Sequence, residues 1–250
     1  MDYFHNVKDL GLNLLRGARD LLYPGCCLLC GRMLPSSVEH FCFDCRHGLF
    51  HDPYPNCPRC GGTVGPYAVV EGRCVACRKE AFAFEQTLRL GPYAGLLQEV
   101  VLRLKNQRSE ILAELVGEYW AREAADRISG LGVDVLVPVP LHWLRRWSRG
   151  YNQSAALCRG LATVLRVPQC PTLLRRVRHT PRQYLQTPSG RKANVRGAFR
   201  ARSGQSIRGR SILLVDDVMT TGATVGEASK ALVAAGAKRV VVAVLARAQG

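Results

Sequence analysis

A short segment near the C-terminal end of the chain combines residue types that could bind a phosphorylated sugar. Asp216 and Asp217 end the apolar run 211–215, and small or hydroxylated residues follow at Thr220, Thr221, Gly222, Ala223 and Thr224. Thr224 and Glu227 fit a capping box, which marks the start of a helix. Backbone amides at such a helix start, with the helix dipole behind them, bind phosphate. Paired carboxylates just before them could hold vicinal ribose hydroxyls, so the segment predicts a ribose 5-phosphate site.

Eight of the eleven cysteines form C-x-x-C pairs, a spacing that lets two thiolates reach one tetrahedral metal. The pairs are Cys27/Cys30, Cys42/Cys45, Cys57/Cys60 and Cys74/Cys77. In a chain without an export signal, a disulfide framework is the weaker interpretation. We predict two closed, structural zinc sites, joining the first pair with the second and the third with the fourth. A crossed arrangement, first with third, is the alternative. Nearby His40, His47 and His51 are expected at the surface.

Positive charge is concentrated in one part of the chain. The chain has 35 Lys and Arg against 19 acids, and residues 141–210 hold fifteen Arg, one Lys and no acid. A region of one sign attracts polyanions such as nucleic acid, or phosphorylated small molecules. The candidate contacts to nucleic acid or pyrophosphate are Arg145, Arg146, Arg178, Arg182 and Arg191. Aromatic residues lie among them at Trp143, Trp147, Tyr151 and Tyr184, where they either stack on bases or belong to the core.

Alternating strand and helix patterns must position these residues. Strands are expected at 84–90, 133–140, 173–177, 211–215 and 240–246, and helices at 96–104, 109–128, 152–165 and 224–235. Residues 181–194 have no periodicity and are expected to form a mobile loop. Strands that alternate with helices imply an α/β domain with a mainly parallel sheet flanked by helices.

The chain is expected to have three parts. Residues 1–22 fit an amphipathic helix, residues 23–82 a small Cys-rich zinc-ribbon-like module, and residues 83–250 the α/β domain. The Cys-rich part is too loop-like to hold itself together by burial alone, which favours metal binding. No run of apolar residues approaches the length of a membrane helix or a signal peptide, so a cytoplasmic location without a transmembrane segment is expected.

Between a strand and a helix, the chain has two acids, a threonine pair and Gly222. This arrangement resembles the phosphoribosyl pyrophosphate (PRPP) motif of type I phosphoribosyltransferases. This resemblance implies that Asp216 and Asp217, as catalytic residues, hold the ribose hydroxyls and that 220–224 cradle the 5-phosphate, with Mg²⁺ accompanying PRPP. It also implies a pyrophosphate loop at 137–141 and a closing loop at 178–194. The expected contacts of the pyrophosphate loop are Pro140, Leu141, Arg149 and Asn152. Asn152 could equally be a helix cap, and Lys105 either a phosphate contact or a helix-terminal charge.

Several features together resemble the ComF family of competence-associated proteins over about residues 20–246. They are the Cys-rich part, the runs 137–141 and 149–154, the stretch 183–199 and the phosphate loop. The resemblance implies a PRPP-binding protein that handles incoming single-stranded DNA during natural transformation, with competence proteins as possible partners. The alternative is an active phosphoribosyltransferase that moves ribose 5-phosphate from PRPP to an acceptor nitrogen.

Overall fold

The computed structural model describes residues 25–35, 37–106, 109–178, 188–202 and 207–248. The amphipathic helix expected at 1–22 lies outside these residues. The chain divides between Gly48 and Leu49 into unit 1, which contains the first two cysteine pairs, and unit 2, which contains the rest. Helix α2 (Phe43–Phe50) begins in unit 1. The domain boundary expected after residue 82 stays a prediction.

Unit 2 is built on a four-stranded parallel sheet with the strand order β3-β8-β7-β4. The strands are β3 (Gln86–Pro92), β4 (Val135–Pro138), β7 (Ser211–Met219) and β8 (Arg239–Arg247). Two-stranded antiparallel ribbons accompany it: β1 (Val69–Val70) with β2 (Arg73–Cys74), and β5 (Leu174–Arg176) with β6 (Phe199–Ala201). The expected parallel α/β architecture is confirmed.

The central strands are almost wholly apolar because both faces of the sheet are covered. Every residue of β8 between its two terminal arginines is buried, and so is every residue of β7 except Val218. One face carries Val240, Val242 and Val244, which share a core with Leu232 of helix α9 (Ala223–Ala234). The other face packs on helices α3 (Gly95–Asn106) and α7 (Gln153–Leu165). Asp216 and Asp217 are therefore held in a rigid, dry setting.

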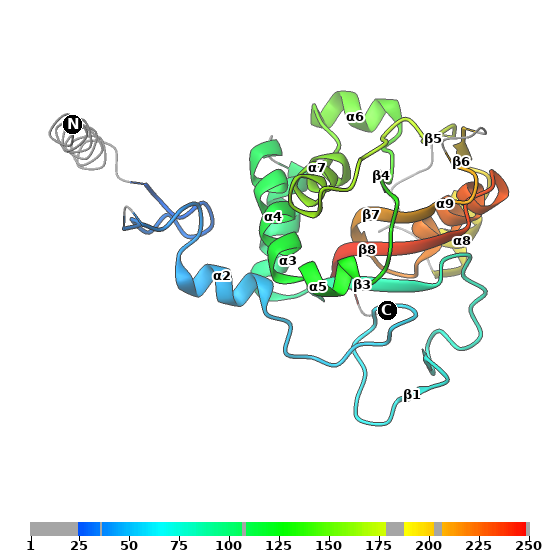
Figure 1. The fold of residues 1–250 in the computed structure, drawn as a ribbon, viewed down its shortest axis with the longest axis horizontal. Helices are drawn as coiled ribbons and strands as arrows, with labels where there is room; N and C mark the ends of the chain where they lie inside the picture. The colour runs from blue at the N-terminus through cyan, green and yellow to red at the C-terminus, as the bar shows by residue number, and fades with distance from the viewer. Residues whose placement is uncertain (1–24, 36, 107–108, 179–187, 203–206, 249–250) are drawn as a thin grey trace, which may run out of the picture. The chain divides into compact units, whose positions relative to one another are not determined.

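Figure 1 shows the helices on the two sides of the sheet, with α3, α4 and α7 on one side and α9 on the other. The helices of unit 2 are α3 (Gly95–Asn106), α4 (Glu110–Glu123), α5 (Ala125–Ser129), α6 (Trp143–Arg149), α7 (Gln153–Leu165), α8 (Pro188–Val195) and α9 (Ala223–Ala234). In the described part of the chain, no helix is long and apolar enough to span a bilayer.

The sequence missed short elements with weak patterns. Helix α6 and strand β6 were not expected, and residues 188–195 form α8 where a loop was expected. The helix expected at 109–128 is interrupted at Ala124, which ends α4 and begins α5. Elements α5, α6, α8 and β6 are only three to eight residues long, so periodicity could not reveal them.

Helices α4 and α7 approach so closely that two glycines are required at their contact. A Cβ atom at Gly160 would overlap the carbonyl oxygen of Glu114 and lie 2.7 Å from the backbone nitrogen of Glu118. A Cβ atom at Gly117 would overlap the carbonyl oxygen of Leu157. The backbones would have to separate to accept any side chain.

Gly160→Ala should therefore lower the free energy of unfolding by about 3 kcal/mol, since overpacking forces a backbone shift. Urea unfolding followed by circular dichroism measures this. Gly65→Ala is the matched control, because a Cβ there meets nothing within 4 Å. Equal effects of the two substitutions would show that the helix contact tolerates expansion.

Candidate functional site

Asp216 and Asp217 are buried near the carboxyl end of β7, where ligands bind in open α/β sheets. The Ser154 hydroxyl donates a hydrogen bond of 3.0 Å to Oδ1 of Asp216. The Gln153 amide donates one of 3.0 Å to Oδ2 of Asp217, and Nζ of Lys105 lies 3.3 Å from the same oxygen. The ends of α3 and α7 thus supply three polar side chains to one acidic pair.

This setting shifts the pKa values of the two carboxyl groups in opposite directions. Burial and the adjacent charge of Asp217 raise the pKa of Asp216 to about 7. Burial also acts to raise the pKa of Asp217, but the Lys105 ammonium and the Gln153 hydrogen bond outweigh it and hold that pKa below its usual range. Asp217 is therefore the charged member of the pair at neutral pH, and Asp216 is partly protonated.

Gln153 has one unsatisfied polar atom. Its side chain is only 3% exposed, and its Oε1 finds no hydrogen-bond donor among the residues that the structure describes. Buried acceptors without a donor are rare and mark a strain, a water or a ligand. A hydroxyl bound beside Asp217 would supply the missing donor.

Gly222 starts helix α9 directly after the acidic strand. It has a φ of 78° and serves as the N-cap, so the helix begins at Ala223. Its first intrahelical bond runs from the Gly226 amide to the Gly222 carbonyl at 2.8 Å. The Ala223 amide at this helix end donates to the Thr221 hydroxyl oxygen at 3.4 Å, and Thr220 and Thr221 beside it are half-buried. The loop and helix N-terminus predicted from the sequence are both present.

The predicted capping box at Thr224 is wrong. The N-cap position of α9 makes no side-chain hydrogen bond, because that position is the left-handed Gly222, two residues before Thr224. Glu227 instead accepts a hydrogen bond of 2.7 Å from the Gly197 amide. Its carboxylate links α9 to the turn before β6.

Asn152 uses both ends of its amide within the protein. Its Oδ1 accepts from the Ser154 amide at 3.2 Å and caps α7, while its Nδ2 donates to the Val139 carbonyl at 3.1 Å. The capping interpretation is therefore confirmed. The loop with Pro140 and Leu141 follows β4, whose neighbour in the sheet is β7. Ligand contacts by Pro140, Leu141, Arg149 and Asn152 stay predictions.

The structure describes the side chains of only some of the predicted arginine contacts. Arg146 and Arg178 are exposed, and Arg149 is half-buried at the end of α6. Arg182 lies outside the described residues, as does Tyr184, and no side-chain position is described for Arg145 and Arg191. Arg159, from the same acid-free stretch, is used in ion pairs with Glu110 and Glu114.

Sequence reasoning missed Gln153 and Ser154 as partners of the acids, and it left Lys105 undecided. The first two lie in the run 149–154, from which only Arg149 and Asn152 were predicted as ligand contacts. Of the aromatic residues, Tyr151 is core and donates to the Leu104 carbonyl at 2.6 Å, whereas Trp143 and Trp147 are exposed.

The cysteines gather into two clusters of four. Cys27, Cys30, Cys42 and Cys45 form one in unit 1, and Cys57, Cys60, Cys74 and Cys77 form the other in unit 2. The Cys30 and Cys42 sulfurs of the first cluster lie 3.8 Å apart, and three sulfur pairs of the second lie 3.6–3.7 Å apart. Tetrahedral zinc with Zn–S bonds of about 2.3 Å places its sulfurs about 3.8 Å apart, whereas a disulfide needs about 2.0 Å. Both clusters fit zinc, with the first pairing predicted rather than the crossed one.

Both clusters share a turn that the spacing alone did not specify. In each, the first cysteine carbonyl accepts from the glycine after the second cysteine, Gly31 or Gly61, at 2.8–2.9 Å. These glycines have φ values of 74° and 66°. The turn brings both thiols of a C-x-x-C pair to one side.

The second cluster is part of the core of unit 2. Its cysteines are buried together with Phe84 and Val244. Arg89 of β3 donates to the Gly61 carbonyl at 2.9 Å and pairs with Asp52 at 2.8 Å. Arg247 at the end of β8 donates to the Cys60 carbonyl at 2.9 Å. The sheet and the cluster therefore support each other.

Comparison with known proteins decides the family. Competence protein F of Haemophilus influenzae is 33% identical over 228 residues, which cover 89% of this chain and 96% of that protein. The chain belongs to the ComF family. DNA utilization protein YhgH of Escherichia coli K12 is 32% identical over 91% of the chain and 99% of its own length, and competence protein ComFC of Bacillus subtilis is 26% identical over 84% and 89%. The phosphoribosyl transferase domain family matches residues 152–250, which confirms the expected fold class.

In this ComF-family chain, the buried Asp216 should make the fold less stable as pH rises. Its folded pKa of about 7 lies above its usual 3.8, so the folded chain keeps a proton that the unfolded chain has lost. Stability therefore falls between about pH 4 and pH 7. Asp216→Asn cannot titrate, so its advantage in free energy of unfolding over the wild type should grow by about 2–3 kcal/mol between pH 5 and pH 8.

Urea unfolding at several pH values measures this difference. Asp126→Asn is the control, since Asp126 is exposed on α5, and its difference from the wild type should stay flat. A flat difference for Asp216→Asn as well would mean that Asp216 is ionised throughout.

Proposed function

We propose that this protein binds PRPP, or another ribose 5-phosphate ester, at the loop between β7 and α9. The observation that carries the proposal is the buried pair Asp216 and Asp217. The N-terminus of helix α9 follows at Gly222, five residues after Asp217. The pair offers acceptors for two ribose hydroxyls, and the amides around Gly222 suit a phosphate. The orphaned Oε1 of Gln153 adds an acceptor beside Asp217.

Mg²⁺ would accompany PRPP and neutralise its pyrophosphate. The residues of this chain would bind and orient the sugar, with the loop after β4 and the arginines beyond it nearest to the pyrophosphate. Isothermal titration calorimetry with PRPP and MgCl₂ tests the proposal. Ribose 5-phosphate should bind more tightly than 2-deoxyribose 5-phosphate, which lacks one hydroxyl. No heat with PRPP at millimolar concentration would overturn it.

Turnover is the alternative to binding alone. In an active transferase, the C1–O bond to pyrophosphate breaks and a bond to an acceptor nitrogen forms, and positioning would matter more than a nucleophilic side chain. Release of pyrophosphate upon addition of nucleobases would favour catalysis. A null result across the bases, with PRPP bound, would favour the non-catalytic function.

We also propose that the chain handles single-stranded DNA in a competence-related role. Its relatives are named competence and DNA utilization proteins. Trp143 and Trp147 lie one helical turn apart on α6 and are 66% and 82% exposed, and Arg146 is exposed on the same helix. Exposed aromatic rings among arginines suit base stacking along a single strand.

Trp143→Ala combined with Trp147→Ala should weaken binding of labelled oligo-dT by at least tenfold, since stacking contributes about 1–3 kcal/mol per base. Fluorescence anisotropy at low salt measures this. Tyr54→Ala combined with Tyr67→Ala removes two other exposed aromatic residues and is the control. Equal losses in both double variants would remove α6 from the DNA site.

A further inference from the structure

The ribbon of β5 and β6 presents a cluster of arginines to solvent. Arg175 lies directly opposite Arg200 in the antiparallel register, and Arg202 follows two residues after Arg200. The ladder continues at both ends, since the Arg202 amide donates to the Leu173 carbonyl and the Val177 amide to the Ala198 carbonyl, each at 2.8 Å. Side chains alternate along a strand, so Arg175, Arg200 and Arg202 leave the same face. Opposite pairs stand about 5 Å apart at Cβ, and diagonal pairs about 7–8 Å.

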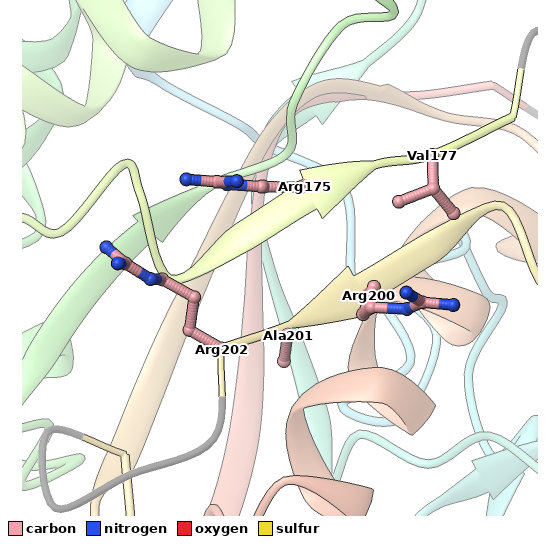
Figure 2. Close-up of a pocket in the computed structure, with 5 residues that line it drawn as sticks. All are labelled: Arg175, Val177, Arg200, Ala201 and Arg202. Carbon is pink, nitrogen blue, oxygen red and sulfur yellow. The ribbon is translucent and has the colours of Figure 1, made fainter.

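Figure 2 shows this face, with the guanidinium groups of Arg175 and Arg202 extending to the same side from the two strands. Together with Val177, Arg200 and Ala201 they line a hollow of about 400 Å³. Arg175, Val177, Arg200 and Arg202 are all exposed. The hollow is open, and neither Asp216 nor Asp217 lines it.

Among the described residues, none explains the position of these arginines by pairing with them. Within the described ranges, no carboxylate or carbonyl pairs with the guanidinium groups of Arg175, Arg200 or Arg202. Residues 141–210, including the segments on either side of the ribbon, contain no acid at all. Like charges directly opposite each other destabilise a β-ribbon. Such an arrangement is stabilised when an anion binds across it.

The inner face of the ribbon fixes these side chains in place. Leu174 and Phe199 are buried in the core that includes Leu232 of α9. The Arg176 guanidinium lies over the Phe199 ring at 5.3 Å. The outer arginines therefore project from a backbone that is anchored by packing, so little order is lost on binding.

We infer that the outer face of the β5–β6 ribbon binds the phosphodiester backbone of a nucleic acid strand. The inference rests on the proposed DNA role and names the surface that serves it. A single strand has one negative charge per nucleotide, which suits a row of arginines of one sign. Among the described residues that line the hollow, none is aromatic, and Val177 is the one exposed large apolar side chain. An acidic protein would need an apolar centre to bind stably, whereas backbone contacts position a strand without reading its sequence.

The test compares two triple variants that remove the same charge. The first is Arg175→Gln/Arg200→Gln/Arg202→Gln. The control is Arg122→Gln/Arg127→Gln/Lys238→Gln, whose residues are exposed on α4, on α5 and before β8. Binding of labelled oligo-dT is measured by fluorescence anisotropy from 50 to 300 mM salt. The ribbon variant should bind at least tenfold more weakly at 50 mM, and its slope of log K against log salt should be shallower by about 2, or about 0.7 per lost contact.

Arg175→Lys/Arg200→Lys/Arg202→Lys keeps the charge and should restore most of the slope, which separates a charge effect from a folding defect. If the ribbon and control variants lose affinity and slope equally, the ribbon is not the site. If the wild type binds no DNA at 50 mM salt, the proposed DNA role itself fails. Binding of labelled poly-L-glutamate but not of DNA would assign the ribbon to an acidic peptide and overturn the inference.

Discussion

Replacing Asp216 and Asp217 together by Asn should weaken PRPP binding by at least about 100-fold. Hydrogen bonds to a charged group contribute about 1.5–3 kcal/mol each, so two of them correspond to two to four orders of magnitude. The substitutions keep the shape of the side chains. The neighbours Ser154 and Gln153 can still donate to Asn oxygens, so the pocket should stay folded.

Isothermal titration calorimetry with PRPP and MgCl₂ measures the loss. Asp126→Asn removes a carboxylate from an exposed position on α5 and should bind PRPP as the wild type does. Inorganic pyrophosphate provides a second comparison, because it lacks the ribose. Its affinity should change far less than that of PRPP. If the double variant binds PRPP within twofold of the wild type, the carboxylates do not hold the ribose.

The two zinc sites should differ sharply in what their loss does to unit 2. Both Cys27→Ser and Cys57→Ser should lower the metal content from two zinc ions per chain to one. Only Cys57→Ser should unfold or severely destabilise unit 2, because Cys57 is fully buried in its core and its cluster is bonded to β3 and β8. Structural zinc contributes about 10–16 kcal/mol of apparent binding energy, which matches or exceeds the whole stability of a typical domain.

Metal analysis of the purified chain gives the zinc content, and thermal unfolding followed by circular dichroism gives the stability. Cys26→Ser is the control, since Cys26 is exposed beside the first cluster and belongs to neither site. It should keep both zinc ions. A wild-type chain with fewer than about one zinc would remove the metal assignment, and equal melting of the Cys27 and Cys57 variants would contradict the integration of the second cluster.

Local signals in the sequence were sufficient to predict the features that depend on residues close together in the chain. The C-x-x-C spacing predicted four-cysteine clusters because two residues between cysteines allow one turn to present both thiols. A helix cap was one of two predictions for Asn152, because its side chain can reach an amide two residues away, and the structure has that bond. The runs 211–215 and 240–246 predicted buried parallel strands because both faces of such strands are apolar.

Other features depend on contacts between segments far apart in the sequence, and no local pattern encodes them. Lys105, Gln153 and Ser154 act on an acidic pair that lies more than 60 residues beyond them. Arg89 joins β3 to the loop of the second cluster. The opposition of Arg175 and Arg200 exists only because β5 pairs with β6 in one register.

The phosphate loop itself combines both kinds of information. The sequence determined that two acids precede a turn of small residues and a helix, since those steps are local. The tertiary structure decided how the acids are charged, because burial and Lys105 come from the folded core. It also decided that Gly222, rather than Thr224, begins α9, since a left-handed glycine starts the helix before the threonine can cap it.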